Sequence, residues 1–189
     1  NPLVRTTKAA RHFGFIQRWK VVGPFDNTDE KGFHVVYPPE RKVDFGARLA
    51  GKSGPVEWTD HLGKDAIEKI DLNAIGKIDL NAILGTEKEV SAYAATEFVW
   101  PEEREVEFRF SSYNAIKLWL NGKLLAEHDF YHGGSGLDQY AVAGRLKQGS
   151  NTILVKVCQN AQTQKWAEPW AFQLRVCDGS GGGLLSKSR

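Results

Sequence analysis

The sequence lacks methionine, has only two cysteines, and contains neither a long apolar run nor a large excess of one charge. No apolar stretch approaches the ~20 residues that a membrane-spanning helix needs, so we expect no membrane insertion. A net charge of +2 over 189 residues is too small to favour nucleic acid or an anionic membrane as a partner. Because the chain starts at Asn1 without a methionine, and no signal peptide is visible, we expect a piece of a longer protein.

The two cysteines, Cys158 and Cys177, are expected to be free thiols. They end two expected strands, 152–158 and 171–177, which are joined by a single loop. If these strands pair as antiparallel neighbours, the two sulfur atoms lie at opposite ends, roughly 20 Å apart at ~3.3 Å per residue. A disulfide needs Cα atoms within about 7 Å, so the pattern argues against one.

Catalytic motifs are absent as well: there is no H-E-x-x-H, no G-x-S-x-G and no P-loop pattern. His128 and His132 have a spacing that suits a metal, with Asp129 between them, but a zinc site needs further ligands from another segment. A glycosidase needs two converging carboxylates, and the sequence shows no pair that converges. We therefore expect a protein that is not an enzyme; a small hydrolase is an alternative without positive support. Its candidate carboxylates are Glu40, Asp129, Asp138 and Glu168.

The sequence does contain a series of short β-rich segments separated by turn signals. Val106, Phe108 and Phe110 alternate with polar side chains, which is typical of a strand with one buried face. Asn121 followed by Gly122 is the strongest short-range signal for a hairpin turn. No helical segments alternate with the strands, so the pattern predicts an all-β sandwich or barrel. The expected strands are 15–22, 90–100, 106–111, 115–121, 123–128, 139–142, 152–158 and 170–177.

Two pairs of motifs carry a resemblance to a known family. The first pair is WLNGK at 119–123 and LKQGSNTILVKV at 146–157; the second is WKVVGPFDN at 19–27 and GFHVVYPPE at 32–40. Together they resemble the galactose-binding-like jelly-roll β-sandwiches that occur as accessory domains in glycoside hydrolases and in multidomain proteins of planctomycete-like bacteria. The resemblance covers about residues 19–178. It implies an antiparallel, jelly-roll-like β-sandwich, a non-catalytic accessory role, and a periplasmic or secreted location.

The expected organisation is one domain with two short extensions. Residues 1–12 are a linker or a short helical lead-in, residues 13–178 form the sandwich, and residues 179–189 are a flexible tail rich in Gly and Ser. Asp138, in the sequence DQY, resembles a family position that precedes the turn into the next-to-last strand. The resemblance implies that Asp138 holds its loop by bonding backbone amides.

A tandem duplication occupies residues 69–84, where KIDLNAIG is followed directly by KIDLNAIL. The family pattern has one such segment, and the second copy makes sense by itself. Asp79 is expected to cap a short helical turn that Gly85 stops. We expect the extra copy to be a neutral insertion in a surface loop, because loops absorb insertions readily. A binding repeat is the alternative.

Binding of a carbohydrate is the favoured functional hypothesis, because sugars need aromatic rings for stacking and polar side chains for hydrogen bonds. Two loops, 129–134 and 159–170, combine both kinds of residue. Trp166 is expected to be the exposed stacking platform, whereas Trp170 directly precedes a strand and has packing under it as the alternative. The candidate ligand-binding residues are Trp166, Trp170, Tyr131, His132, Asp129, Gln159 and Asn160.

A structural calcium ion is the one cofactor that the sequence suggests, since several side chains with hard oxygen ligands follow the Gly23-Pro24 pair. The candidate metal ligands are Asp26, Asn27, Asp29 and Glu30. Their spacing does not match an EF-hand loop, and Asp and Asn already have a sufficient local role in a turn.

The sequence thus predicts a non-catalytic accessory module of a larger bacterial protein. Its expected activity is weak carbohydrate binding, and its other expected partners are the neighbouring domains of the parent protein. The alternative is a structural or protein-interaction spacer without a small-molecule ligand. Packing of Trp166 and Trp170 flat against the sandwich would favour the spacer.

Overall fold

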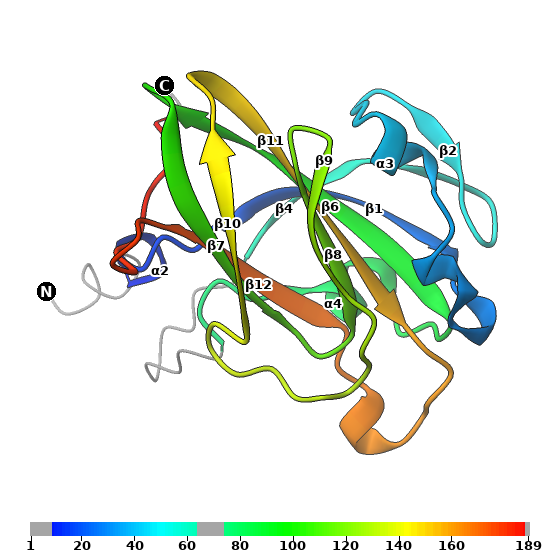
Figure 1. The fold of residues 1–189 in the computed structure, drawn as a ribbon. Helices are drawn as coiled ribbons and strands as arrows, with labels where there is room; N and C mark the ends of the chain where they lie inside the picture. The colour runs from blue at the N-terminus through cyan, green and yellow to red at the C-terminus, as the bar shows by residue number, and fades with distance from the viewer. Residues whose placement is uncertain (1–8, 64–73, 188–189) are drawn as a thin grey trace, which may run out of the picture.

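In the computed structural model, two antiparallel β-sheets pack face to face around the main hydrophobic core (Figure 1). The structure describes residues 9–63 and 74–187. No helix in these two ranges is long and apolar enough to cross a membrane. The predicted all-β antiparallel sandwich is confirmed, and its helices are few and short.

The two sheets of the sandwich contain six and four strands. The larger sheet has the order β4–β1–β6–β11–β8–β9, with the bounds Thr59–Leu62, Arg18–Asp26, Val90–Trp100, Gly149–Gln159, Ala115–Leu120 and Lys123–His128. The smaller sheet has the order β10–β7–β12–β5, with the bounds Tyr140–Leu146, Arg104–Ser112, Ala171–Cys177 and Ile78–Asp79.

A small hairpin and several short helices complete the fold. The hairpin consists of β2 (Arg48–Ala50) and β3 (Pro55–Glu57). The α-helices are α2 (Ala9–His12), α3 (Pro38–Arg41) and α4 (Leu80–Leu84), and the 3₁₀ helices are η1 (Thr28–Phe33) and η2 (Lys165–Ala167).

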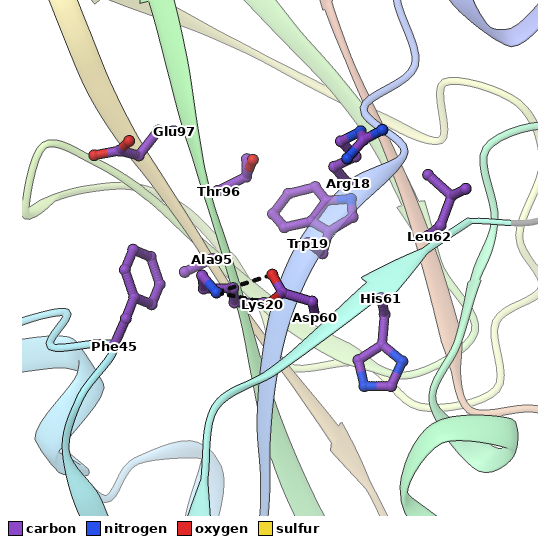
Figure 2. A pocket seen from close by; sticks show the side chains of 10 residues that line it. All are labelled: Arg18, Trp19, Lys20, Phe45, Asp60, His61, Leu62, Ala95, Thr96 and Glu97. Atoms are coloured by element: carbon purple, nitrogen blue, oxygen red, sulfur yellow. Dashed lines mark hydrogen bonds and ion pairs between the residues drawn. The ribbon is translucent and has the colours of Figure 1, made fainter. Parts of the chain in front are cut away.

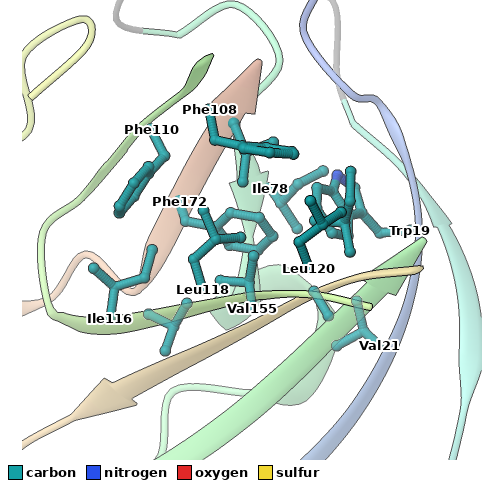
Figure 3. Packing of buried hydrophobic residues seen from close by; sticks show 14 of the residues in the cluster. Trp19, Val21, Ile78, Phe108, Phe110, Ile116, Leu118, Leu120, Val155 and Phe172 are labelled. Atoms are coloured by element: carbon teal, nitrogen blue, oxygen red, sulfur yellow. The ribbon is translucent and has the colours of Figure 1, made fainter. Parts of the chain in front are cut away.

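Side chains that point inward from both sheets form the core. On β7, Val106, Phe108 and Phe110 are buried, which confirms the predicted alternation. Trp19 of β1 and Leu118 of β8 belong to the same cluster, and Figure 3 shows side chains of the two sheets meeting there. Each large apolar side chain buried in this way contributes about 1.5–3 kcal/mol to stability.

The Asn121-Gly122 turn joins β8 to β9 as predicted. Both residues have positive φ angles, 51° and 80°, as a two-residue hairpin turn of type I′ requires. The Asn121 side chain also donates to Asn151 Oδ1 at 2.9 Å and accepts from the Thr152 amide at 3.0 Å. Asn151 is fully buried, and its Oδ1 accepts from the Lys147 amide. The two sequence motifs that indicate the fold therefore hydrogen-bond to each other.

Strand β1 is longer than predicted at its C-terminal end. The sequence suggests a break at Pro24, but β1 pairs with β6 as far as Asp26. The register shifts between Val22 and Phe25 and the ladder then resumes, with Phe25 opposite Ser91. Proline cannot donate to the ladder, so it interrupts the pairing locally without ending the strand.

The two cysteines are free, as predicted, and both are fully buried. The premise about their strands is wrong, however, because β11 and β12 lie in different sheets instead of pairing as neighbours. The loop between them carries the chain from one sheet of the sandwich to the other. Burial raises the pKa of Cys158 to about 12, so its thiol stays protonated at neutral pH.

The described part of the duplication has two different environments. Residues 69–73 of the first copy lie outside the described residues. Ile75, near the end of that copy, is 3% exposed and packs with Phe15. In the second copy the Asp79 carboxylate accepts from the Ala82 amide at 3.2 Å and caps α4, as predicted. The buried Ile75 does not fit a neutral insertion in a surface loop.

The segment predicted to be a flexible tail makes backbone hydrogen bonds to both sheets within residues 179–187. The Leu184 amide donates to Val176 of β12, and the Lys187 amide donates to Val99 of β6, both at 2.8 Å. Leu184 also packs against the main core. This part of the tail thus lies against the sandwich.

Lys156 of β11 is a fully buried cation on the outer face of the six-stranded sheet. Its ammonium group donates to Glu40 Oε1 and to the Val35 carbonyl, each at 2.8 Å. The Tyr93 hydroxyl donates to the same Glu40 oxygen at 2.5 Å. These bonds fasten the segment 33–40 to the sheet, where apolar side chains pack as a second cluster.

Asp138 holds the loop before β10, but it does so through arginine side chains. Its carboxylate accepts from Arg175 Nε at 2.7 Å, from Arg175 Nη2, and from Arg109 Nη1 at 3.3 Å. The predicted role of Asp138 in bonding backbone amides is therefore wrong, because its carboxylate bonds two arginine side chains instead. Burial alone would raise the pKa of Asp138, but the hydrogen bonds and charges of Arg175 and Arg109 outweigh it and lower that pKa.

We expect Glu40→Gln to lower the free energy of unfolding by about 3 kcal/mol or more, because it leaves the Lys156 ammonium buried without a counter-charge. Adding Lys156→Met should restore part of that loss, since the unpaired charge is then gone. Urea denaturation measures both effects. The control is Asp60→Asn, which breaks the exposed ion pair with Lys20 and should cost less than about 1 kcal/mol. Equal losses for Glu40→Gln and Asp60→Asn would contradict the prediction.

The contribution of Asp138 to stability should depend on pH. Because its pKa is lowered in the fold, it stabilises the protein above the unfolded-chain value of about 3.9, and this contribution is lost as the pH falls through the lower folded pKa. Melting temperatures of the wild type and Asp138→Asn, measured from pH 7 to pH 2, should differ most at neutral pH. The difference should shrink below about pH 4. A difference that stays constant with pH would disprove the assignment.

Candidate functional site

Two loops with the predicted mixture of residues meet at one end of the sandwich. One follows β9 and carries Tyr131 and His132; the other follows β11 and carries Asn160 and Trp166. Figure 1 shows both loops at the same end of the sheets. Trp166 is 59% exposed, and its ring meets the His132 ring edge to face, with centroids 5.4 Å apart. The predicted exposure of Trp166 is confirmed.

A chain of polar contacts connects these loops to η1. Asn160 Nδ2 donates to Glu30 Oε1 at 2.9 Å, and Asn160 Oδ1 lies 2.8 Å from His132 Nε2. Since the amide oxygen only accepts, this network assigns the His132 proton to Nε2. His132 Nδ1 is buried and has no hydrogen-bond partner among the described residues. We call Glu30, Tyr131, His132, Asn160 and Trp166 the loop cluster.

Tyr131 is placed by a buried asparagine. Asn27 Nδ2 donates to the Tyr131 hydroxyl at 3.1 Å and to the Gln159 carbonyl at 3.0 Å, while Asn27 Oδ1 accepts from the Phe33 amide at 3.0 Å. Burial raises the pKa of Tyr131, so the phenol is neutral at physiological pH. Asn27 thus holds the Tyr131 side chain in position from the buried side of the loop cluster.

Two of the predicted ligand-binding residues are structural. Trp170 is 1% exposed, and its indole N–H donates to the Val157 carbonyl at 3.3 Å, so its ring has no free face for a sugar. Gln159 is fully buried, and its amide donates to the Ala167 carbonyl at 3.2 Å. Both are corrected from ligand contacts to supports of the loop that carries Trp166.

Asp129 lies at the rim of the loop cluster. It is exposed, and its carboxylate is 3.2 Å from His34 Nε2. It precedes Tyr131 by two residues, and among the described residues its carboxylate pairs with His34 and not with Asn160. Its carboxylate is therefore a flanking acceptor.

The predicted calcium ligands do not converge. Asp26 accepts from Thr28 and pairs with Lys52, whereas Asp29 pairs with Lys31. The remaining two, Asn27 and Glu30, bond within the loop cluster. Among the described residues no group of three or more His, Cys, Asp or Glu side chains could hold a metal. The structure thus gives these side chains roles in turns and contacts between loops.

A hollow of about 570 Å³, which the sequence analysis does not predict, lies on the outer face of β1, β4 and β6. Figure 2 shows Lys20 and Asp60 paired at its centre and Phe45 on one side. The Lys20 ammonium lies 2.9 Å from the Asp60 carboxylate and 5.5 Å from the centre of the Phe45 ring. Four separate segments form this hollow, and no local motif marks them. In the sequence, only the alternation of side chains along β1 indicates that some of them, such as Lys20, point to the outer face of the sheet.

No family model matches the chain, and no curated protein matches it. Similar solved structures include a family 35 carbohydrate-binding module from Clostridium thermocellum, with 15% identity and a TM-score of 0.33. That match covers 47% of this chain and 72% of the module.

Two further solved structures cover more of the chain. β-Glucosidase from Kluyveromyces marxianus in complex with glucose is 14% identical with a TM-score of 0.43, and the match covers 85% of this chain but only 15% of the enzyme. An anti-sigma factor domain-containing protein from Clostridium clariflavum is 14% identical with a TM-score of 0.44, and the match covers 91% of this chain and 45% of that protein.

Proposed function

We propose that the domain is a non-catalytic accessory module that binds saccharides weakly through the loop cluster, within a larger exported bacterial protein. One observation carries the proposal: Trp166 exposes 59% of its surface beside the polar side chains of three loops. The Trp166 ring also contacts the His132 imidazole edge to face, which orients it within the cluster.

The chemistry of the cluster suits a sugar ring. The apolar C–H face of a sugar stacks on the Trp166 indole, while its hydroxyl groups donate hydrogen bonds to the Glu30 carboxylate and the Asp129 carboxylate. His132 Nδ1 is a further acceptor that a small rotation of the loop would expose. A single aromatic platform buries little area, so we expect dissociation constants on the order of 1 mM, or about −4 kcal/mol.

A structural or protein-interaction spacer is the second candidate. It is favoured by the burial of Trp170, one of the two tryptophans whose packing distinguishes the two hypotheses. The exposure of Trp166 speaks against it. A spacer would bind no oligosaccharide at millimolar concentration.

We expect Trp166→Ala to weaken saccharide binding at least tenfold, because it removes the stacking platform and leaves the sandwich intact. Cello-, xylo- and galacto-oligosaccharides are titrated to millimolar concentration while tryptophan fluorescence is recorded. The wild type should show a saturable shift of the emission, and the variant should not.

The control is Leu62→Ala, which removes an apolar side chain of similar exposure, 66%, on β4. It should bind like the wild type. Unchanged affinity in Trp166→Ala would contradict the assignment of the site. Absence of binding by the wild type to every oligosaccharide would favour the spacer.

A further inference from the structure

A second hollow, of about 260 Å³, lies on the outer face of the six-stranded sheet beside the Asn121-Gly122 turn. Its floor includes Trp119 of β8 and Leu154 of β11, and α3 with the residues after it forms the opposite side. Figure 1 shows α3 and the tip of the β8–β9 hairpin on this side of the sheet. The hollow is separate from the loop cluster, since none of the loop-cluster residues lines it.

Three cations line this hollow without a counter-charge: Arg41, Lys42 and Lys147. All three are exposed, and no ion pair joins any of them to a carboxylate within residues 9–63 and 74–187. Some cations of the six-stranded sheet are paired, such as Lys117 with Glu127 at 3.1 Å. We call this site the cationic hollow.

The acids nearest to these cations do not neutralise them. Glu40 lines the hollow, but its Oε1 already accepts from the Lys156 ammonium and the Tyr93 hydroxyl. Glu97 lies opposite Thr152 across the β6–β11 ladder, but it lines the neighbouring hollow of Figure 2. The local charge of the cationic hollow is therefore positive.

Three neutral polar side chains also line the hollow: the Trp119 indole N–H is a donor, while Asn121 and Thr152 can both donate and accept. Trp119 is 6% exposed, and its indole N–H is a hydrogen-bond donor. An indole N–H, a guanidinium and two ammonium groups are donors only, and none of them can accept. The site is therefore matched to a ligand that presents acceptor oxygens and negative charge.

We propose that the cationic hollow binds a monosaccharide that carries an oxyanion, either the carboxylate of a uronic acid or a sulfate ester. The oxyanion pairs with Arg41 and Lys147, and the apolar face of the ring lies over Trp119 and Leu154. The volume lies just below the usual range of drug-sized pockets, about 300–1,000 Å³, which suits one sugar ring. The saccharide part of this inference rests on the proposed function, whereas the oxyanion part rests on the unpaired cations.

The test follows the Trp119 indole N–H by ¹H–¹⁵N NMR, with the peak assigned from the loss of signal in Trp119→Phe. Glucuronate, glucose 6-sulfate, glucose and inorganic sulfate are titrated separately at low and high NaCl. We expect a saturable shift of this peak with glucuronate or glucose 6-sulfate, and the acid that shifts it identifies the oxyanion. Salt should weaken this binding because it screens exposed charges.

Variants then locate the site. The double variant Arg41→Ala with Lys147→Ala should weaken binding of the acidic sugar at least tenfold. The control is Lys123→Ala, which removes one positive charge from the β8–β9 hairpin beside the cationic hollow but lines a different hollow, and it should change affinity by less than about twofold. If the double variant and the control changed the affinity equally, the assignment of binding to the cationic hollow would be overturned.

Two further outcomes would overturn the ligand class. Glucose that shifts the Trp119 peak as strongly as the acidic sugars would remove the requirement for an oxyanion. Inorganic sulfate that binds as tightly as glucose 6-sulfate would show an anion site without sugar recognition. The Trp166→Ala variant should leave the Trp119 shift unchanged, so failure at the loop cluster and failure at the cationic hollow can be told apart.

Discussion

The buried ion pair between Lys156 and Glu40 holds the segment between β1 and β4 against the outer face of the six-stranded sheet. A buried ammonium without a partner costs several kcal/mol. This cost favours the position in which Glu40 pairs with Lys156 over other positions of the segment. The same segment contains η1, which presents Glu30 to the loop cluster, and α3, which carries Arg41 to the cationic hollow. Both candidate surfaces therefore include residues of the segment that this ion pair joins to the sheet.

The loop cluster forms because neighbouring antiparallel strands bring their ends together. Strands β1, β6 and β11 are adjacent, so the C-terminal ends of β1 and β11 lie beside the start of β6. The backbone of Glu89, just before β6, links them: its carbonyl accepts from the Asn27 amide at 2.8 Å, and its amide donates to the Asn160 carbonyl at 3.2 Å. Register thus places η1 and the Trp166 loop side by side.

The two surfaces have opposite chemistry. The loop cluster offers an exposed indole and carboxylate acceptors, which suit the hydroxyl groups of a neutral sugar. The cationic hollow offers donors around an apolar floor, which suits an oxyanion. Their separation on one small domain is possible because the loops between strands and the outer face of a sheet are independent surfaces of a sandwich.

The sequence by itself determined the longer strands, the hairpin and the exposed tryptophan, because alternation, the Asn121-Gly122 turn and loop composition are local signals; it did not indicate the short strands β2 to β5. It also indicated Asp79 as a cap, which depends on residues three apart. Tertiary structure decided that β11 and β12 lie in different sheets, that Trp170 and Gln159 are supports, and that Asp138 bonds arginines. It also decided that Lys156 is buried with Glu40. Those outcomes join residues far apart in the chain, and their pairing is set by how the two sheets pack.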